Sequence, residues 1–500
     1  MQTEGEIVNV AELMAQSGVG FGTSGARGLV VDMTDRVCYA YTLGFLQYLR
    51  DSGRLQRGSQ VAIAGDFRAS TPRIMASTAM AVRDFGCQPI NCGFIPTPAL
   101  ALFGIEQGLA SLIVTGSHIP DDRNGIKFNQ ASGEILKQDE AGIRAQQVSI
   151  PPGLFDLAGR SHEPFSLPPQ TSAAYDAYVR RYLEFFPEHC LQGRRVGLYQ
   201  HSSVAWRSFE EILRGLGAEC VLLGHSRRFV PVDTEAVRPE DVSLARQWAA
   251  QLDLDCIVSS DGDGDRPLIS DENGKWLRGD VAGILCAKFL GARHPVTPVS
   301  SNSALEACNW FERVDRTRIG SPYVIAAMQA ALDAGEGGVV GYEANGGFLI
   351  GDPVLRDGRV LSPLPTRDAA IVVLAIIMLT LEWGLPVSRL LCRLPQRFTA
   401  SGRLKSVPTE LSRRFIDGLN SGDLAHDRER IESIFAADFG PVAATDDTDG
   451  LRIAFASGEV VHLRPSGNAP ELRCYNEADS QARAEQMSRI CLRVLENRLS

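Results

Sequence analysis

The clearest indication of the fold is ASLIVTGSHIP, residues 110–120, in which an unbroken apolar run leads directly into a polar loop. A continuous apolar run bounded by turn residues is typical of a strand that is buried on both faces of a sheet. Similar runs occur at VAIAG (61–65), CIVS (256–259) and VVGY (339–342), and longer segments with helical periodicity lie between them. We therefore predict α/β domains built on mainly parallel, buried sheets.

Three of the predicted strands continue into polar loops that contain glycine. These loops read TGSH (115–118), SDGDGD (260–265) and EANGG (343–347). Ligands of open α/β sheets bind at the carboxyl ends of the strands. We therefore expect the three loops to line one cleft.

The length of the chain indicates more than one domain. Five hundred residues exceed what one hydrophobic core usually supports. Proline-rich stretches at 151–169 and 395–408 are typical of connections between domains. The segment HPVTPVSSNS, residues 294–303, is a third candidate boundary, with a simple loop as the alternative.

The overall charge and hydropathy limit the partners. A formal net charge of −10 argues against nucleic acid or an anionic membrane as a partner, so an anionic substrate needs a local basic pocket. The first 18 residues lack the pattern of a signal peptide. The longest apolar run, residues 369–381, is shorter than the roughly 20 residues of a membrane-spanning helix and predicts a buried core helix. We expect a cytoplasmic protein.

The cysteines carry no recognisable pattern. Eleven are present without a CxxC motif or a Cys/His cluster. This distribution predicts reduced thiols rather than a disulfide framework or a zinc site.

Asp261, Asp263 and Asp265 alternate with glycine directly after a predicted strand. In an extended segment alternate side chains point to one side, so the three carboxylates converge and favour Mg²⁺. A solvated acidic turn is the alternative. An EF-hand calcium loop fits Glu272 at its twelfth position, but Arg266 stands where that loop requires glycine.

Ser117 and His118 follow the strand at 110–114. A serine in such a turn is more often structural than nucleophilic, and the GxSxG pattern of hydrolases is absent. Taken alone, a histidine such as His118 is more often an ordinary hydrogen-bonded polar residue than a base.

Further segments suit sugar and phosphate groups. Glu343 and Asn345 lie among glycines and could bind paired sugar hydroxyls, with a simple glycine-rich turn as the alternative. The segment RPSGNAPELR, residues 464–473, could form a phosphate cradle, with a hairpin turn as the alternative. Arg27 and Lys127 are cations beside glycine turns, or else solvated surface charges.

Several motifs, in this order, resemble those of the α-D-phosphohexomutase family. They are FGTSGARG (21–28), GDFRASTP (65–72), VTGSHIP with NGIKF (114–128), DGDGDR (261–266), GYEANGG (341–347) and RPSGNAPELR (464–473). The chain is most similar to bacterial phosphomannomutase-type members. The resemblance implies three similar α/β/α domains with mixed sheets and a smaller C-terminal α+β domain around a central cleft. The expected ranges are 1–150 with the phosphoserine loop, 170–290 with the metal loop, 291–395 with the sugar loop, and 400–500 with the phosphate loop.

The resemblance also implies a role for each site residue. Ser117 is the expected phosphoserine, which binds Mg²⁺ together with Asp261, Asp263 and Asp265. Lys127 and His118 are candidates for the general base, with Lys127 favoured. The expected cations around the transferred phosphoryl group are Arg27, Lys127 and Arg266. The expected substrate-binding residues are Glu343, Asn345, Arg464, Ser466, Gly467, Asn468 and Arg473.

The chain departs from the family pattern at several of these loops. Gly116 and Ile119 replace the common Ala and Asn beside the serine. Asn345 and Gly347 replace the usual Ser and His of the sugar loop, so a histidine contact with the sugar is not carried over. Asn468 replaces a frequent Thr in the phosphate loop.

The implied reaction interconverts hexose 6-phosphate and hexose 1-phosphate through the phosphoserine. Hexose 1,6-bisphosphate is the implied intermediate and activator, and the mannose phosphates are the favoured substrates. A phosphoglucomutase of the same mechanism is the nearest alternative. A Mg²⁺-dependent sugar phosphatase and a non-catalytic sensor of sugar phosphates are the others.

Overall fold

The computed structural model describes residues 5–22, 25–163, 165–466 and 470–499. The chain forms two compact units. The first comprises Met1–Pro295 and Gly320–Leu390, and the second comprises Val296–Ile319 and Leu391–Ser500. The four domain ranges expected from the sequence stay a prediction.

The first sheet of the first unit has seven strands. Their order is β2 (Gly20–Phe21), β3 (Gly25–Leu29), β7 (Arg123–Gln130), β6 (Ala110–Val114), β4 (Gln60–Gly65) and β5 (Gln88–Phe94), with β8 (Gly133–Glu134) paired to β7. β5 and β6 run parallel to β4, whereas β7 is antiparallel to both β6 and β3. The apolar run at 110–114 is therefore a fully buried interior strand, as predicted, in a mixed sheet.

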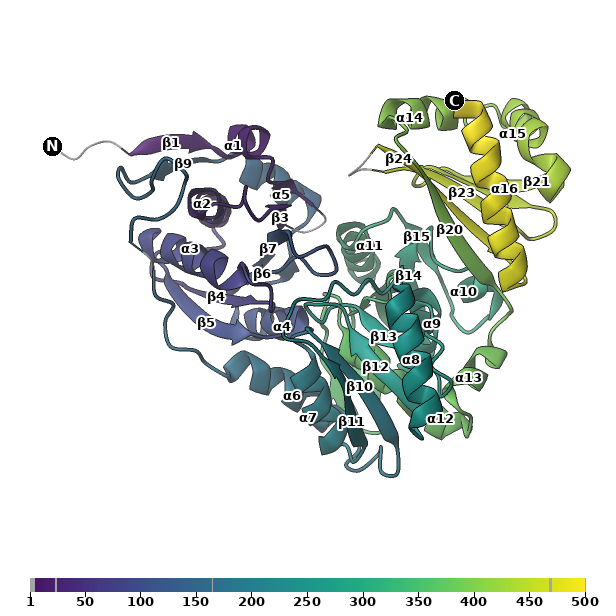
Figure 1. Cartoon of the computed structure of the whole chain (residues 1–500), viewed down its shortest axis with the longest axis horizontal. Helices are drawn as coiled ribbons and strands as arrows, with labels where there is room; N and C mark the ends of the chain where they lie inside the picture. Colours follow the sequence, from purple (N-terminus) through teal and green to yellow (C-terminus); the bar gives the residue numbers. More distant parts are fainter. Residues whose placement is uncertain (1–4, 23–24, 164, 467–469, 500) are drawn as a thin grey trace. The chain divides into compact units, whose positions relative to one another are not determined.

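Helices cover both faces of this sheet (Figure 1). Val61 and Ile63 of β4 belong to one hydrophobic cluster with α2 (Asp35–Asp51) and α3 (Thr71–Asp84). Ala62 and Ala64 are equally buried but lie outside that cluster, and α4 (Thr97–Gln107) packs against β4. Successive side chains of a strand point to opposite faces, so the sheet lies between two helical layers.

Short elements complete this region. β1 (Glu6–Asn9) pairs antiparallel with β9 (Gln147–Ile150), and α1 (Val10–Ser17) and α5 (Lys137–Arg144) pack against α2.

The second sheet has the order β11 (Glu219–His225), β10 (Arg195–His201), β12 (Cys256–Ser260) and β13 (Pro267–Ile269). Its first three strands are parallel, and β13 is an antiparallel edge strand. α7 (Trp206–Gly215) packs on β10 and β11, α8 (Pro239–Gln251) packs on β12, and α6 (Ala173–Phe185) contacts α7. A strand, not a helix, follows the aspartate loop, which excludes an EF-hand there.

The rest of the first unit contains two antiparallel pairs, β16 (Val339–Tyr342) with β17 (Phe348–Ile350) and β18 (Val354–Arg356) with β19 (Arg359–Leu361). Its helices are α9 (Gly279–Phe289), α11 (Ser321–Asp333), α12 (Ala369–Trp383) and α13 (Val387–Leu390). Most residues of α12 are buried, and α12 packs against α9, so the predicted core helix is confirmed.

We find no single helix among the described residues with the length and apolar composition to cross a membrane. One pair of consecutive helices, Ala369–Trp383 and Val387–Arg393, has the required length and apolar composition when taken together. The two helices are bent by 80° at the break between them. The eleven cysteines are free thiols.

The second unit is built on an antiparallel sheet of five strands. Their order is β20 (Phe398–Lys405), β24 (Glu471–Ala478), β23 (Val460–Pro465), β22 (Leu451–Phe455) and β21 (Val442–Asp446). The helices α14 (Thr409–Asp417), α15 (Leu424–Phe439) and α16 (Gln481–Leu499) share one hydrophobic core with it, and α16 lies along β20 and β24 (Figure 1). This is the predicted α+β arrangement.

The second unit also holds smaller elements. β15 (Asp315–Thr317) pairs parallel with residues 296–298 of β14 (His294–Pro298). The short helix α10 (Ala304–Ala307) and the 3₁₀ turn η1 (Leu391–Arg393) belong to the same unit.

Candidate active site

Ser117 lies just after the interior strand β6, in a strained backbone conformation. Its φ of 54° falls in the left-handed region, which is uncommon for a residue with a side chain. Its amide donates to Thr115 Oγ1 (2.8 Å), and the Thr115 hydroxyl donates to Asp66 Oδ2 (2.8 Å). Ser117 is only 1% exposed. Such strain persists only where the surroundings hold it, and it is concentrated at functional positions.

The buried Arg68 side chain holds the serine loop through hydrogen bonds to its backbone carbonyl groups. Its Nη2 donates to the carbonyls of Ser117 (3.0 Å) and Ile119 (2.7 Å), and its Nη1 donates to two further carbonyls of residues 120 and 123. Its Nε bonds to Asp66 Oδ2 (3.1 Å). A Cβ at Gly116 would lie 2.6 Å from the Arg68 Cζ, so the glycine found there gives the guanidinium its room. Arg68 belongs to the sequence motif GDFRASTP, but the motif alone assigned it no role.

The three predicted metal ligands converge directly after β12. One carboxylate oxygen each of Asp261, Asp263 and Asp265 lies within 4.8 Å of the others, and all three side chains are buried. Ser117 Oγ donates to Asp261 Oδ2 at 2.5 Å. A Cβ at Gly262 would lie 2.8 Å from the Ser117 carbonyl oxygen, so this glycine lets the two loops approach.

The chemistry of this cluster fits a bound cation. Burial, followed by the charges of Asp263 and Asp265, raises the pKa of Asp261 well above its usual value. Asp263 Oδ1 and Asp265 Oδ1 are buried and accept no hydrogen bond from the described residues. Buried carboxylate oxygens of this kind are costly unless a positive charge compensates them. The aspartate cluster can therefore hold a metal ion.

Lys127 supplies part of that positive charge. Its Nζ lies on the adjacent strand β7 and donates to Asp263 Oδ2 (2.6 Å) and Asp265 Oδ2 (2.7 Å). Burial alone would lower the pKa of Lys127, but the two carboxylates outweigh it and raise the pKa. Lys127 is therefore an ammonium ion in this arrangement.

Arg27 and Arg266 add further cationic groups. Arg266 Nε lies 3.6 Å from Asp265 Oδ1. Burial, and next the charge of Arg266, lower the pKa of Arg27 on β3 to about 10. A bound anion near Arg27 would offset the effect of Arg266 and favour the charged form of Arg27.

His118 is a neutral acceptor in this arrangement. Arg266 Nη1 lies 2.8 Å from His118 Nδ1, and because a guanidinium can only donate, Nδ1 accepts. Burial, and next Arg266, lower the pKa of His118 to about 3. Nδ1 also lies 3.2 Å from Ser117 Oγ, so the predicted serine and histidine are in direct contact.

The glycine-rich loop between β16 and β17 is closed by its own polar groups. Asn345 Oδ1 accepts from the Gly347 amide (2.9 Å), and the Asn345 carbonyl accepts from Thr234 Oγ1 (2.7 Å). Glu343 Oε2 is buried and accepts no hydrogen bond from the described residues. The side-chain oxygen of Asn345 thus shapes the turn, whereas Glu343 Oε2 can still accept a hydrogen bond from a ligand.

Sequence reasoning missed three residues of this cluster. Thr97, at the start of α4, donates from Oγ1 to Asp263 Oδ2 (2.6 Å). Arg367 Nη2 lies 3.1 Å from Asp265 Oδ2 and 3.7 Å from Glu134 Oε1. No sequence pattern marks Thr97 or Glu134 as a site residue. Arg367 lies just before an apolar helix, where a charged residue is ordinarily exposed to solvent at the end of the helix.

The other predicted phosphate ligands lie in the second unit. Arg464 on β23 stands opposite Arg473 on β24, which stands opposite Arg403 on β20. Directly opposite residues share one face of a sheet, and like charges there are unfavourable without a counter-charge. Arg464 Nε donates to Asp449 Oδ2 (2.9 Å). This row of arginines includes Arg403, which the sequence did not reveal.

The turn after β23 is described only in part. The buried Ser466 donates its amide to the Glu471 carbonyl (2.8 Å). Gly467 and Asn468 lie outside the described residues.

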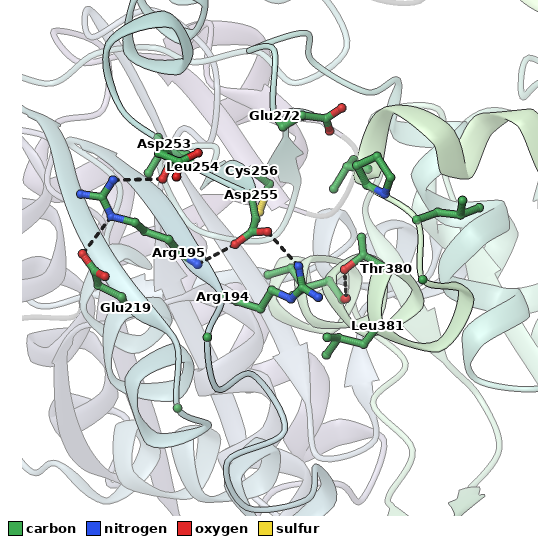
Figure 2. A pocket seen from close by; sticks show the side chains of 17 residues that line it. Arg194, Arg195, Glu219, Asp253, Leu254, Asp255, Cys256, Glu272, Thr380 and Leu381 are labelled. Carbon is green, nitrogen blue, oxygen red and sulfur yellow. Dashed lines mark hydrogen bonds and ion pairs between the residues drawn. The ribbon is translucent and has the colours of Figure 1, made fainter.

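A separate cavity of about 840 Å³ lies at the other end of the second sheet. Arg195, Glu219 and Cys256, which begin β10, β11 and β12, line it, whereas the aspartate loop follows the carboxyl end of β12. Figure 2 shows its arginines paired with acids: Arg194 with Asp255 (2.8 Å) and Arg195 with Glu219 (2.9 Å). Both arginines of this cavity are therefore compensated by carboxylates that also line it.

Comparisons with known proteins agree with this geometry. Residues 18–150, 278–398 and 424–490 match the models of phosphoglucomutase/phosphomannomutase α/β/α domain I, α/β/α domain III and C-terminal domain. The chain is 43% identical to phosphomannomutases of Sinorhizobium fredii (95% of this chain, 98% of the relative) and Salmonella muenchen (95% of each). A solved phosphoglucomutase/phosphomannomutase family protein of Burkholderia thailandensis superposes with a TM-score of 0.70 at 19% identity, over 95% of this chain and 96% of that one. These matches, together with the serine and aspartate loops, show that the chain belongs to the phosphoglucomutase/phosphomannomutase family.

Proposed function

We propose that the protein is a phosphomannomutase, which interconverts mannose 6-phosphate and mannose 1-phosphate through a phosphorylated Ser117. The family identifies the chain as a phosphohexomutase, that is, an isomerase that moves a phosphoryl group within a hexose. The preference for mannose follows from the relatives at 43% identity. One contact carries the assignment of the nucleophile, namely the 2.5 Å hydrogen bond between Ser117 Oγ and Asp261 within the aspartate cluster.

Mg²⁺ is the metal that suits this cluster best. Asp261, Asp263 and Asp265 would hold it together with the Ser117 oxygen, because hard carboxylate oxygens suit Mg²⁺, which shares its shell with phosphate. When bound, Mg²⁺ would neutralise charge on the transferred phosphoryl group. Orphaned oxygens on Asp263 and Asp265 support this role.

The side chains around Ser117 suit the positioning and charge neutralisation that phosphoryl transfer demands. The O6 or O1 hydroxyl of the sugar attacks phosphorus, the bond from phosphorus to Ser117 Oγ breaks, and hexose 1,6-bisphosphate forms. The bisphosphate then reorients and returns its other phosphoryl group to the serine. Arg27 and Arg266 stabilise the negative charge of the group in transit.

The attacking sugar hydroxyl must lose a proton. Lys127 and His118 are the two candidates for this role, and we retain Lys127. As an ammonium ion it must first release a proton, and a loss of negative charge on Asp263 and Asp265 would favour that release, because these two carboxylates raise its pKa. By contrast, His118 has little affinity for a proton, because burial and Arg266 lower its pKa to about 3.

Binding of the sugar phosphate is assigned to two loops. Glu343 accepts hydrogen bonds from sugar hydroxyls, and Asn345 holds the loop in shape. Arg464, Ser466 and Arg473, with Gly467 and Asn468, bind the phosphate that is not being transferred, because arginine pairs with phosphate in a two-pronged way. We retain a cytoplasmic location as part of the proposal.

The experiment combines substitution of Ser117 with a direct assay of the product. Wild-type protein with Mg²⁺ and a trace of mannose 1,6-bisphosphate should convert mannose 1-phosphate to mannose 6-phosphate, and Ser117→Ala should lose turnover. Intact mass spectrometry should find one added phosphoryl group on the wild type and none on Ser117→Ala. Turnover that persists in the variant contradicts the assignment.

The same assay separates the alternatives. Stoichiometric release of inorganic phosphate would indicate a phosphatase, and binding of hexose phosphate without a phosphoserine would indicate a sensor. Equal or better turnover of glucose 1-phosphate would indicate a phosphoglucomutase of the same mechanism.

A further inference from the structure

Arg367 joins three parts of the first unit through one buried guanidinium. Its side chain is 3% exposed. Nη2 lies 3.1 Å from Asp265 Oδ2 in the aspartate loop and 3.7 Å from Glu134 Oε1 on β8, and Nη1 lies 3.5 Å from Glu343 Oε2. One rigid group therefore spans the aspartate cluster and the loop that carries Glu343.

The residue directly after Arg367 is firmly anchored. Asp368 donates its amide to the Phe348 carbonyl (2.9 Å), and its carboxylate caps α12 at the Ala370 amide (3.0 Å). The same carboxylate accepts from the Tyr178 hydroxyl (2.6 Å). Arg367 therefore leaves the chain from a fixed point.

The path of the Arg367 side chain requires a glycine in the facing loop. A Cβ at Gly347 would lie 2.7 Å from both Cγ and Cδ of Arg367. The absence of a side chain at residue 347 thus lets the aliphatic part of Arg367 pack against the loop backbone. Arg367 and this loop are fitted to each other.

The charges explain why an arginine stands here. Burial alone lowers the pKa of Arg367, but the carboxylates of Asp265, Glu134 and Glu343 outweigh it and raise the pKa. Glu343 Oε2 accepts no hydrogen bond from the described residues, and Arg367 is its ion-pair partner. The pair places a positive charge 3.5 Å from the carboxylate and leaves its acceptor capacity for a ligand.

We propose that Arg367 is a positioning residue that determines sugar specificity, because it holds the Glu343 carboxylate against the aspartate cluster at a fixed orientation. Discrimination between two hexoses that differ at one hydroxyl needs a rigidly placed hydrogen-bond partner. Lysine keeps the charge but binds as a single point, so it cannot span Asp265 and Glu343 with a rigid fork. The inference rests on the proposed mutase function.

The test compares Arg367→Lys, Gly347→Ala and a control, Arg238→Lys. Arg238 also binds a buried carboxylate with two nitrogens, Asp241 at 2.8 and 2.7 Å, outside the aspartate cluster. For each protein kcat and KM are measured with mannose 1-phosphate and glucose 1-phosphate, and the ratio of the two kcat/KM values is formed. A role confined to folding would lower both values together and leave the ratio unchanged.

We expect Arg367→Lys to move that ratio at least about fivefold toward one, the factor expected when one ordinary hydrogen bond is lost. Gly347→Ala should move it in the same direction, because its methyl group displaces the Arg367 side chain, and this variant keeps the test open if Arg367→Lys fails to fold. Arg238→Lys should keep the wild-type ratio.

The outcomes distinguish a failure of the proposed mutase function from a failure of the proposed role of Arg367. A wild type without turnover on either sugar overturns the mutase function itself. A wild type with turnover but no preference, or with a preference that both Arg367→Lys and Gly347→Ala retain, overturns only the role of Arg367.

Discussion

Replacement of Lys127 by methionine tests the charge balance of the site most directly. Lys127 Nζ bonds to Asp263 (2.6 Å) and Asp265 (2.7 Å), and all three side chains are at most 8% exposed. Loss of one partner from a buried ion pair costs about 3–5 kcal/mol, because the remaining charge is uncompensated. Methionine nearly preserves the volume, so little of the loss comes from a cavity. In EDTA we expect a lower melting temperature by about 4–7 °C, at roughly 1.3 °C per kcal/mol for a unit as large as the first one.

Mg²⁺ should reverse much of this loss. The variant lacks a cation that bonds to the same carboxylates, so saturating Mg²⁺ should raise its melting temperature more than that of the wild type. Scanning calorimetry with EDTA and along a Mg²⁺ titration measures both effects. Lys137→Met is the matched control, since Lys137 pairs with Glu140 (2.6 Å) but is 44% exposed. Exposed pairs contribute about 0–1 kcal/mol.

Two results would refute this reasoning. One is a melting temperature of Lys127→Met in EDTA that equals that of Lys137→Met. The other is a Mg²⁺ response of Lys127→Met no larger than that of the wild type.

Three further predictions concern the metal, pH and the distal phosphate. Asp263→Asn should raise the Mg²⁺ concentration for half-maximal turnover at least about tenfold, and an unchanged titration would exclude Asp263 as a ligand. Burial lowers the pKa of His201 to about 4, so between pH 6.5 and 4 the unfolded chain binds a proton at His201 and the folded chain does not. The free energy of unfolding should therefore fall by up to about 3 kcal/mol from pH 6.5 to 4. His201→Gln, which can still donate to the Ser260 carbonyl, should show a smaller fall in melting temperature over that range, and an unaltered slope would refute the assignment. Arg464→Met should lower kcat/KM for mannose 1-phosphate about 10- to 100-fold, the effect of one charge-assisted hydrogen bond; a value within twofold of wild type would remove Arg464 from the phosphate site.

Much of the site could be predicted because its chemistry is concentrated in short loops. The aspartates alternate within five residues, and Ser117 follows an unmistakable buried strand, so local pattern was sufficient for both. The buried helix 369–381 was equally clear from its apolar composition. Asn345 stays a predicted sugar ligand, and the structure adds that its side-chain oxygen closes its own turn.

Residues that act through another residue could not be predicted in this way. Arg68, Thr97 and Arg367 each reach their partners across large separations in sequence, as with Thr97 and Asp263, 166 residues apart. Thr97 and Arg367 stand in no pattern that distinguishes them from ordinary surface or capping residues, and the motif GDFRASTP, which contains Arg68, assigned it no role. The strain at Ser117 was likewise invisible, because backbone dihedrals depend on the carbonyls that Arg68 holds.

The alternation of strands and helices, the acidic loop and the serine after a buried strand could all be predicted from the sequence alone, because apolar periodicity and residue chemistry are local properties. The charge pairs became known from the packing of distant segments: Lys127 between two aspartates, His118 as an acceptor, and Arg367 between the aspartate cluster and Glu343. The physical reason is that pairing energies inside a protein depend on distance and burial, and both are set only when distant segments pack together.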